Sequence, residues 1–117
     1  MLPIAIDVMS GDSEPREYVA GALQALADDP QLQVFLVGDR ALIERELTAS
    51  TAAVRARCEL VAASQVVTME EKPREAIRHK KDSSMRRAVD LVREARAGAA
   101  VSAGNTGALT ADRKSVV

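Results

Sequence analysis

The stretch "PIAIDVM", residues 3–9, is a compact apolar run rich in isoleucine and valine, and the polar break "SGD" follows it at once. A short run of this kind, bounded by turn residues, is typical of a buried strand. Three later runs share the pattern: "LQVFLVGD" at 32–39, "CELVAA" at 58–63 and "GAAVSA" at 98–103. We therefore predict four strands.

Helical periodicity fills the stretches between these runs. After the first strand, apolar residues recur at the spacing of one helix face: Val19, Ala22, Leu23 and Leu26. Asp12 or Ser13 is the expected N-cap of this helix, with Pro15 in its first turn. Further helices are predicted across "RALIEREL", from about Pro73, and over 83–96. The apolar face predicted for the last of these comprises Met85, Ala88, Val89, Val92 and Ala95.

Strands that alternate with helices predict a mostly parallel sheet with helices on both faces. The expected fold class is therefore α/β, a Rossmann-like three-layer α/β/α arrangement. In such sheets ligands bind beyond the carboxyl ends of the strands. Three polar breaks fall at that edge: "DVMSGD", "VGD" and "VSAGNTG".

Composition narrows the function classes. The chain has 117 residues, a formal net charge of -1 and two aromatic residues, Tyr18 and Phe35, so nucleic acid is not an expected partner. Cys58 is the single cysteine, which excludes an internal disulfide and a thiolate zinc cluster. Asp7 interrupts the N-terminal apolar run and no apolar run is long enough for a membrane helix, so we expect no signal peptide, no membrane helix and a cytoplasmic protein.

The loop "SAGNTG", residues 102–107, is the first candidate site. Gly104 and Gly107 allow close approach of a ligand, and Asn105 and Thr106 add side-chain donors at the start of a helix. These features suit a phosphate or a developing oxyanion. A helix cap with a tight turn is the alternative interpretation. The loop matches neither the GxGxxG nor the P-loop nucleotide motif.

The second candidate is "HKKDSSM", residues 79–85. Lys80 and Lys81 precede a predicted helix whose first turn carries Ser83 and Ser84, a combination that favours an anion. The alternative is a solvated basic patch with Asp82 as the N-cap.

The third candidate is "DVMSGD", which brings Asp7 and Asp12 to the end of the first strand. We expect these carboxylates to orient neighbouring groups rather than to bind a metal ion. In the alternative interpretation Asp12 caps a helix and Asp7 bonds a loop. His79 is expected on the surface and Cys58 in the core.

Taken together and in this order, "IAIDVMSGD", "KKDSSM" and "VSAGNTGAL" resemble the N-terminal portion of the bacterial phosphate acyltransferase family, over about Ile4 to Thr110. The resemblance implies conversion of acyl-acyl-carrier protein and inorganic phosphate to acyl phosphate, for phospholipid synthesis. It also implies a fold like that of phosphate acetyltransferases and isocitrate dehydrogenase-like enzymes, a homodimer and no cofactor. It leaves peripheral membrane association of the full-length protein open.

The resemblance also implies roles for residues in the three loops. Asn105, Lys81 and Asp82 are the expected catalytic residues. The expected phosphate- and substrate-binding residues are Asp7, Gly11, Asp12, Lys80, Ser83, Ser84, Ser102, Gly104, Thr106 and Gly107. The lysines would neutralise phosphate, and Asn105 would hold phosphate or the thioester oxyanion.

The chain departs from the family in two places. Ser10 stands where the family usually has glycine, and the family continues well beyond the end of this chain. The tail "DRKSVV", residues 112–117, resembles nothing in the family. We therefore expect an acyltransferase-like segment over 1–111 and a truncated or frame-shifted end over 112–117. An inactive α/β fragment with residual phosphate or carrier-protein binding is the alternative function.

Overall fold

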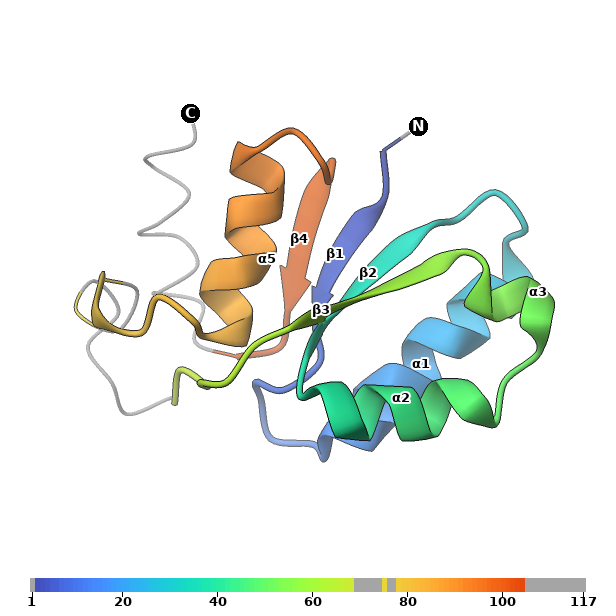
Figure 1. Cartoon of the computed structure of the whole chain (residues 1–117), viewed down its shortest axis with the longest axis horizontal. Coiled ribbons are helices and arrows are strands. Elements are labelled where there is room, and N and C mark those ends of the chain that lie inside the picture. Colours follow the sequence, from blue (N-terminus) through green and yellow to red (C-terminus); the bar gives the residue numbers. More distant parts are fainter. Residues whose placement is uncertain (1, 69–74, 76–77, 105–117) are drawn as a thin grey trace.

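The computed structural model describes residues 2–68, 75 and 78–104 (Figure 1). Four strands form one sheet in the order β3-β2-β1-β4, and every pairing is parallel. The strands are β1 (Ile4–Asp7), β2 (Val34–Gly38), β3 (Cys58–Ala62) and β4 (Ala99–Ser102). The four predicted strands and the α/β class are confirmed.

Alternating residues of the central strand β2 divide the core into two layers. Val34 and Leu36 join one apolar cluster, which includes residues of helices α1 (Pro15–Asp28) and α2 (Arg40–Thr48). Phe35 and Val37 join a second cluster with helix α5 (Ser84–Arg93). Helices therefore cover both faces, as the three-layer prediction requires, and Figure 1 shows α5 on the opposite side of the sheet from α1 and α2.

The strand register decides which loops meet. In the pairing of β1 with β4, Asp7 lies opposite Ser102, and in the pairing with β2 it lies opposite Val37. All four strands run in the same direction, so their carboxyl ends lie at one edge of the sheet. We refer to this edge as the carboxyl edge.

The predicted ends of the helices were wrong in three places. The N-cap of α1 is Glu14, which makes no side-chain cap bond, instead of Asp12 or Ser13. The N-cap of α5 is Ser83, so the alternative role of Asp82 as its cap is also wrong. Ala95 has a positive φ of 59° and lies beyond the end of α5, because the chain there turns back toward the sheet. Leu91 takes the buried place on the α5 face that had been expected of Ala95.

Other predictions concern elements that the structure adds or leaves undescribed. A short helix α3 (Ala52–Arg55), capped by the Thr51 side chain, was not expected. The helix predicted from Pro73 and the tail over 112–117 fall outside the described residues, apart from isolated positions of that helix. Within the described part of the chain, no helix combines the length and the apolar character needed to cross a bilayer.

Candidate functional site

Asp7, the last residue of β1, ties together two loops at the carboxyl edge. Its side chain is 2% exposed. One carboxylate oxygen, Oδ1, accepts hydrogen bonds from the Met9 N–H at 3.0 Å and the Ser10 N–H at 3.3 Å. The other, Oδ2, accepts from the Ser102 hydroxyl at 2.9 Å, and the Ser102 Oγ in turn accepts from the Gly104 N–H at 3.1 Å. The carboxylate therefore fixes the loop after β1 and the start of the loop after β4 in one arrangement.

Two glycines let these loops approach each other closely. Gly11 has a φ of +116°, and a Cβ on it would collide with the Tyr18 hydroxyl and lie 3.0 Å from the Ala103 Cβ. A Cβ on Gly104 would collide with the Ser10 Cβ and lie 3.2 Å from the Met85 Cε. Side chains at either position would push the loops apart. The loop after β1, the loop after β4 and the first turn of α5 thus converge at Gly104.

The first turn of α5 is held by the segment that follows β3. Its N-cap, Ser83, accepts a hydrogen bond from the Arg86 N–H through Oγ at 3.0 Å. The Ser84 N–H donates to the Gln65 carbonyl at 2.9 Å. The positive end of α5 therefore lies at the carboxyl edge, and the Met85 side chain reaches Gly104.

Two hydroxyls at this edge are buried without a hydrogen-bond partner. They belong to Ser10, which is 1% exposed, and Ser84, which is 0% exposed, and neither Oγ has a partner in the described part of the chain. Buried polar atoms in folded proteins are nearly always bonded, so each exception calls for an explanation.

The Asp82 carboxylate links the segment after β3 to helix α5. Its carboxylate accepts from the Ser64 N–H at 3.0 Å, from the Ser64 hydroxyl, and from the Arg87 guanidinium at 2.7 Å. The hydrogen bonds from Ser64 and Arg87 lower the pKa of Asp82 below its ordinary value. The carboxylate is therefore ionised at neutral pH, and its oxygens are occupied by protein donors.

The two lysines of "HKKDSSM" differ in their surroundings. The Lys80 ammonium donates to the Val66 carbonyl at 2.9 Å, and its side chain is half-buried. Lys81 is exposed, as is the neighbouring His79. The surface location predicted for His79 is confirmed.

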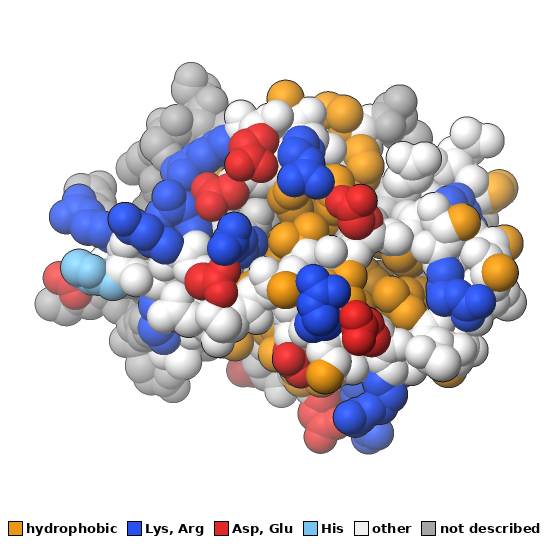
Figure 2. Space-filling model, in the orientation of Figure 1, with side chains coloured by type: hydrophobic (Ala, Val, Ile, Leu, Met, Phe, Trp, Pro, Cys, Tyr) orange, Lys and Arg blue, Asp and Glu red, His pale blue; other side chains and the backbone are white. Residues whose placement is uncertain are grey.

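The local charge around this segment is positive, although the whole chain carries -1. Between residues 78 and 96 there are seven Lys or Arg against three Asp or Glu, whereas the rest of the chain carries nine against fourteen. Figure 2 shows the blue side chains gathered over the part of the surface that contains α5 and the segment before it. Such a surface attracts anions to the adjoining edge.

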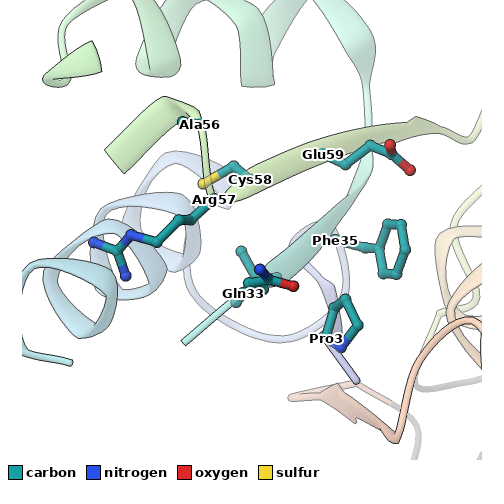
Figure 3. Close-up of a pocket in the computed structure, with 8 residues that line it drawn as sticks. Pro3, Gln33, Phe35, Ala56, Arg57, Cys58 and Glu59 are labelled. Carbon is teal, nitrogen blue, oxygen red and sulfur yellow. The ribbon is translucent and has the colours of Figure 1, made fainter. Parts of the chain in front are cut away.

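A hollow of about 260 Å³ lies at the opposite edge of the sheet, at the amino ends of the strands. Its lining includes Pro3, Gln33 and residues 56–59. Figure 3 shows that the Arg57 side chain points away from the hollow. Its guanidinium donates to the carbonyls of Leu26, Asp29 and Leu32 at 2.6–3.1 Å and so closes the end of α1.

Cys58, on β3, lines this hollow and is half-buried at the margin of the first apolar cluster, so its predicted place in the core is met only in part. Burial raises the pKa of its thiol, which keeps the sulfur protonated and a poor nucleophile. The hollow thus offers a structural arginine and an inert thiol, and the candidate site remains at the carboxyl edge.

The structure brings together most of the described residues that were predicted for the site. The converging set is Asp7, Gly11, Ser83, Ser84, Ser102 and Gly104. Asp12 and Lys81 are exposed at its margin, while Asp82 and Lys80 are engaged by protein groups. Asn105, Thr106 and Gly107 lie outside the described residues.

Sequence reasoning did not assign three residues that shape the site. Ser64 bonds Asp82, Tyr18 packs against Gly11 and accepts from the Ser13 N–H, and Ser10 fills the space beside Gly104. Only Ser10 carried a signal, because it stands in the loop after β1 where the family usually has glycine. Among the described residues, no group of three or more His, Cys, Asp or Glu side chains is placed to hold a metal ion.

Comparison with known proteins identifies the family. A family model described as "Fatty acid synthesis protein" matches residues 2–117. The chain belongs to this family. Relatives in it are named phosphate acyltransferase: the protein of Pseudomonas fluorescens is 52% identical over 108 residues, and that of Chromobacterium violaceum is 47% identical over 116. A third, from Shewanella halifaxensis, is 45% identical over 113 residues.

These alignments include 92%, 99% and 97% of this chain but only 32%, 34% and 33% of the three relatives. The chain therefore spans about a third of the length of the curated relatives it matches. The resemblance inferred from the three loop motifs is confirmed at the level of the family.

Proposed function

We propose that this chain carries the phosphate-binding part of an acyltransferase that converts acyl-acyl-carrier protein and inorganic phosphate to acyl phosphate. The observation that carries the proposal is the convergence of the loops after β1 and β4 with the first turn of α5, beside a basic surface. The names of the relatives give the reaction class.

In the proposed reaction, a phosphate oxygen attacks the thioester carbonyl carbon. The new C–O bond forms, the C–S bond breaks, and the carrier's thiol leaves. Positive charge from Lys80, Lys81 and the end of α5 would favour phosphate, and Asn105 would stabilise the oxyanion that develops on the carbonyl oxygen. Because Asp7 and Asp82 are occupied by protein donors, both would position loops rather than contact substrate.

The remaining length of the relatives would complete the cleft, the homodimer and the surface for the carrier protein. By itself the 117-residue chain is therefore expected to bind phosphate without turnover. The proposed enzyme is cytoplasmic and uses no cofactor.

A chimera tests the proposal. Residues 1–110 of this chain replace the aligned part of the Pseudomonas fluorescens relative, and release of the carrier's thiol is measured with and without phosphate. Phosphate-dependent release near the rate of the relative is expected. In the same chimera, Asn105→Asp should lower this rate at least about tenfold, because a second negative charge would face the phosphate. A chimera that folds but releases no thiol would contradict the proposal.

A further inference from the structure

The two unpartnered hydroxyls at the carboxyl edge distinguish this region from the rest of the described structure. Ser10 and Ser84 are 1% and 0% exposed, and they are the described residues whose buried side-chain oxygens lack a partner. Other serine hydroxyls nearby are bonded: that of Ser83 caps α5, that of Ser64 reaches Asp82, and that of Ser102 reaches Asp7. Desolvating a hydroxyl without giving it a partner costs free energy, so a group that arrives later is the natural partner.

Ser10 lies at the junction around Gly104, and Ser84 lies in the first turn of α5, next to the residue whose side chain reaches that junction. Ser10 packs against Gly104, which also approaches the Met85 Cε. Ser84 directly precedes Met85. It shares the sheet-facing row of α5 with Ala88 and Leu91, which pack on Ala5 and Val37. Ser84 therefore faces the carboxyl edge from the helix side, while Ser10 approaches the junction from the loop after β1.

We propose that the Ser10 hydroxyl, together with that of Ser84, donates a hydrogen bond to the phosphate anion bound at this junction. The inference rests on the proposed function and adds Ser10 as a binding residue. The positive end of α5 points to the charge of the ligand, since it favours an anion. Because the Ser10 and Ser84 hydroxyls are buried, a hydrogen bond from either to an anion is stronger than one made at the protein surface.

The proposal has a kinetic consequence. Both oxygens are closed off from solvent, so phosphate can reach them only when the packing around them opens. Association should therefore be limited by that opening, and the observed rate should reach a plateau at high phosphate concentration.

The test compares Ser10→Ala and Ser84→Ala with the wild-type 117-residue chain. Inorganic phosphate binding is measured by calorimetry, and the free energy of unfolding by urea denaturation without phosphate. Each substitution should weaken phosphate binding at least about tenfold, the factor for a lost bond to a charged group. Neither should lower the free energy of unfolding, because each removes a buried hydroxyl that has no partner in the unliganded protein.

Ser50→Ala is the matched control. The Ser50 hydroxyl donates to the Leu47 carbonyl at 2.7 Å, far from the carboxyl edge in the chain segment after α2. This variant should be less stable than the wild type and bind phosphate equally well.

The outcomes separate the two proposals. Equal phosphate affinity in the wild type, Ser10→Ala and Ser84→Ala would overturn the inference and assign the hydroxyls to packing or to an ordered water. A wild type that binds no phosphate would also overturn the inference. A chimera without thiol release, combined with weakened phosphate binding in both serine variants, would overturn the acyltransferase reaction and support the binding site.

Discussion

Replacing Asp7 by asparagine tests whether this carboxylate holds the two loops of the site together. An asparagine can keep its oxygen on the N–H groups of Met9 and Ser10, but both bonds lose their charge. Its amide nitrogen then faces the Ser102 hydroxyl, which donates to the carboxylate in the wild type. That hydroxyl has to turn round and is left without an acceptor.

The expected loss follows from these three bonds. A hydrogen bond to a charged group contributes about 1.5–3 kcal/mol, against about 0.5–1.5 kcal/mol for a neutral one. Losing the bond from Ser102 and weakening the other two should lower the free energy of unfolding by about 3 kcal/mol. Urea denaturation followed by circular dichroism measures the loss. An unchanged slope of the unfolding free energy against urea concentration indicates that the fold is intact. Asp12→Asn, at an exposed position of the same loop, is the control and should change stability by less than about 0.5 kcal/mol.

A fall of less than about 1 kcal/mol in Asp7→Asn would refute the reasoning, because a neutral amide would then serve as well as the carboxylate. A double-mutant cycle with Ser102→Ala sharpens the test. The two residues are in direct contact, so the double variant should lose less stability than the sum of the single losses by about 1 kcal/mol.

Three further predictions concern other parts of the molecule. Arg57→Ala should lower the free energy of unfolding by about 2–3 kcal/mol, because the carbonyls of Leu26, Asp29 and Leu32, at and beyond the end of α1, each lose a donor. The exposed control Arg16→Ala should change it by less than about 0.5 kcal/mol. Asp82 has a lowered pKa, so its carboxylate stabilises the fold above its ordinary value of 3.8 and loses that effect as the pH falls through the lowered pKa. The stability difference between the wild type and Asp82→Asn, less than about 1 kcal/mol at this partly exposed site, should therefore be constant near neutral pH and disappear in acid; a difference that grew in acid would contradict the assignment. Burial raises the pKa of Cys58, so iodoacetamide should modify the native thiol about tenfold more slowly than the urea-unfolded thiol, and equal rates would show that the thiol is accessible.

Local sequence patterns were sufficient to predict the strands, because their signals lie within a few residues. The run "VFLVG" of β2 is buried along its whole length, as a strand covered on both faces must be. The segment "AAVR" of α3 is too short to show a helical period, so it could not be predicted in the same way.

The ends of helices depended on contacts that the pattern does not contain. Asp and Ser are both common N-cap residues, so Asp82 and Ser83 were equally good candidates. Ser83 caps α5, and the Asp82 carboxylate is bonded to Ser64 and Arg87 instead. Ser64 lies 18 residues away in the chain, so no local rule identifies it.

The candidate site divides in the same way. The loop motifs identified residues at the carboxyl edge, but the bond between Asp7 and Ser102 joins positions 95 residues apart and follows from the register of β1 with β4. The buried and unpartnered state of Ser10 likewise follows from its packing against Gly104, which only the three-dimensional arrangement supplies.

The position of β1 between β2 and β4 has a consequence for synthesis on the ribosome. β1 is translated before β2 and can pair with it early, but its other side has no partner until β4 is translated, 95 residues after Asp7. At about 5–20 residues per second, this delay is roughly 5–20 s. During that interval the nascent chain exposes an open strand edge next to the apolar residues that α5 later covers. A chaperone that binds extended apolar segments would therefore find its target in the first half of the chain, and crosslinking to stalled nascent chains should detect it before β4 emerges but not after.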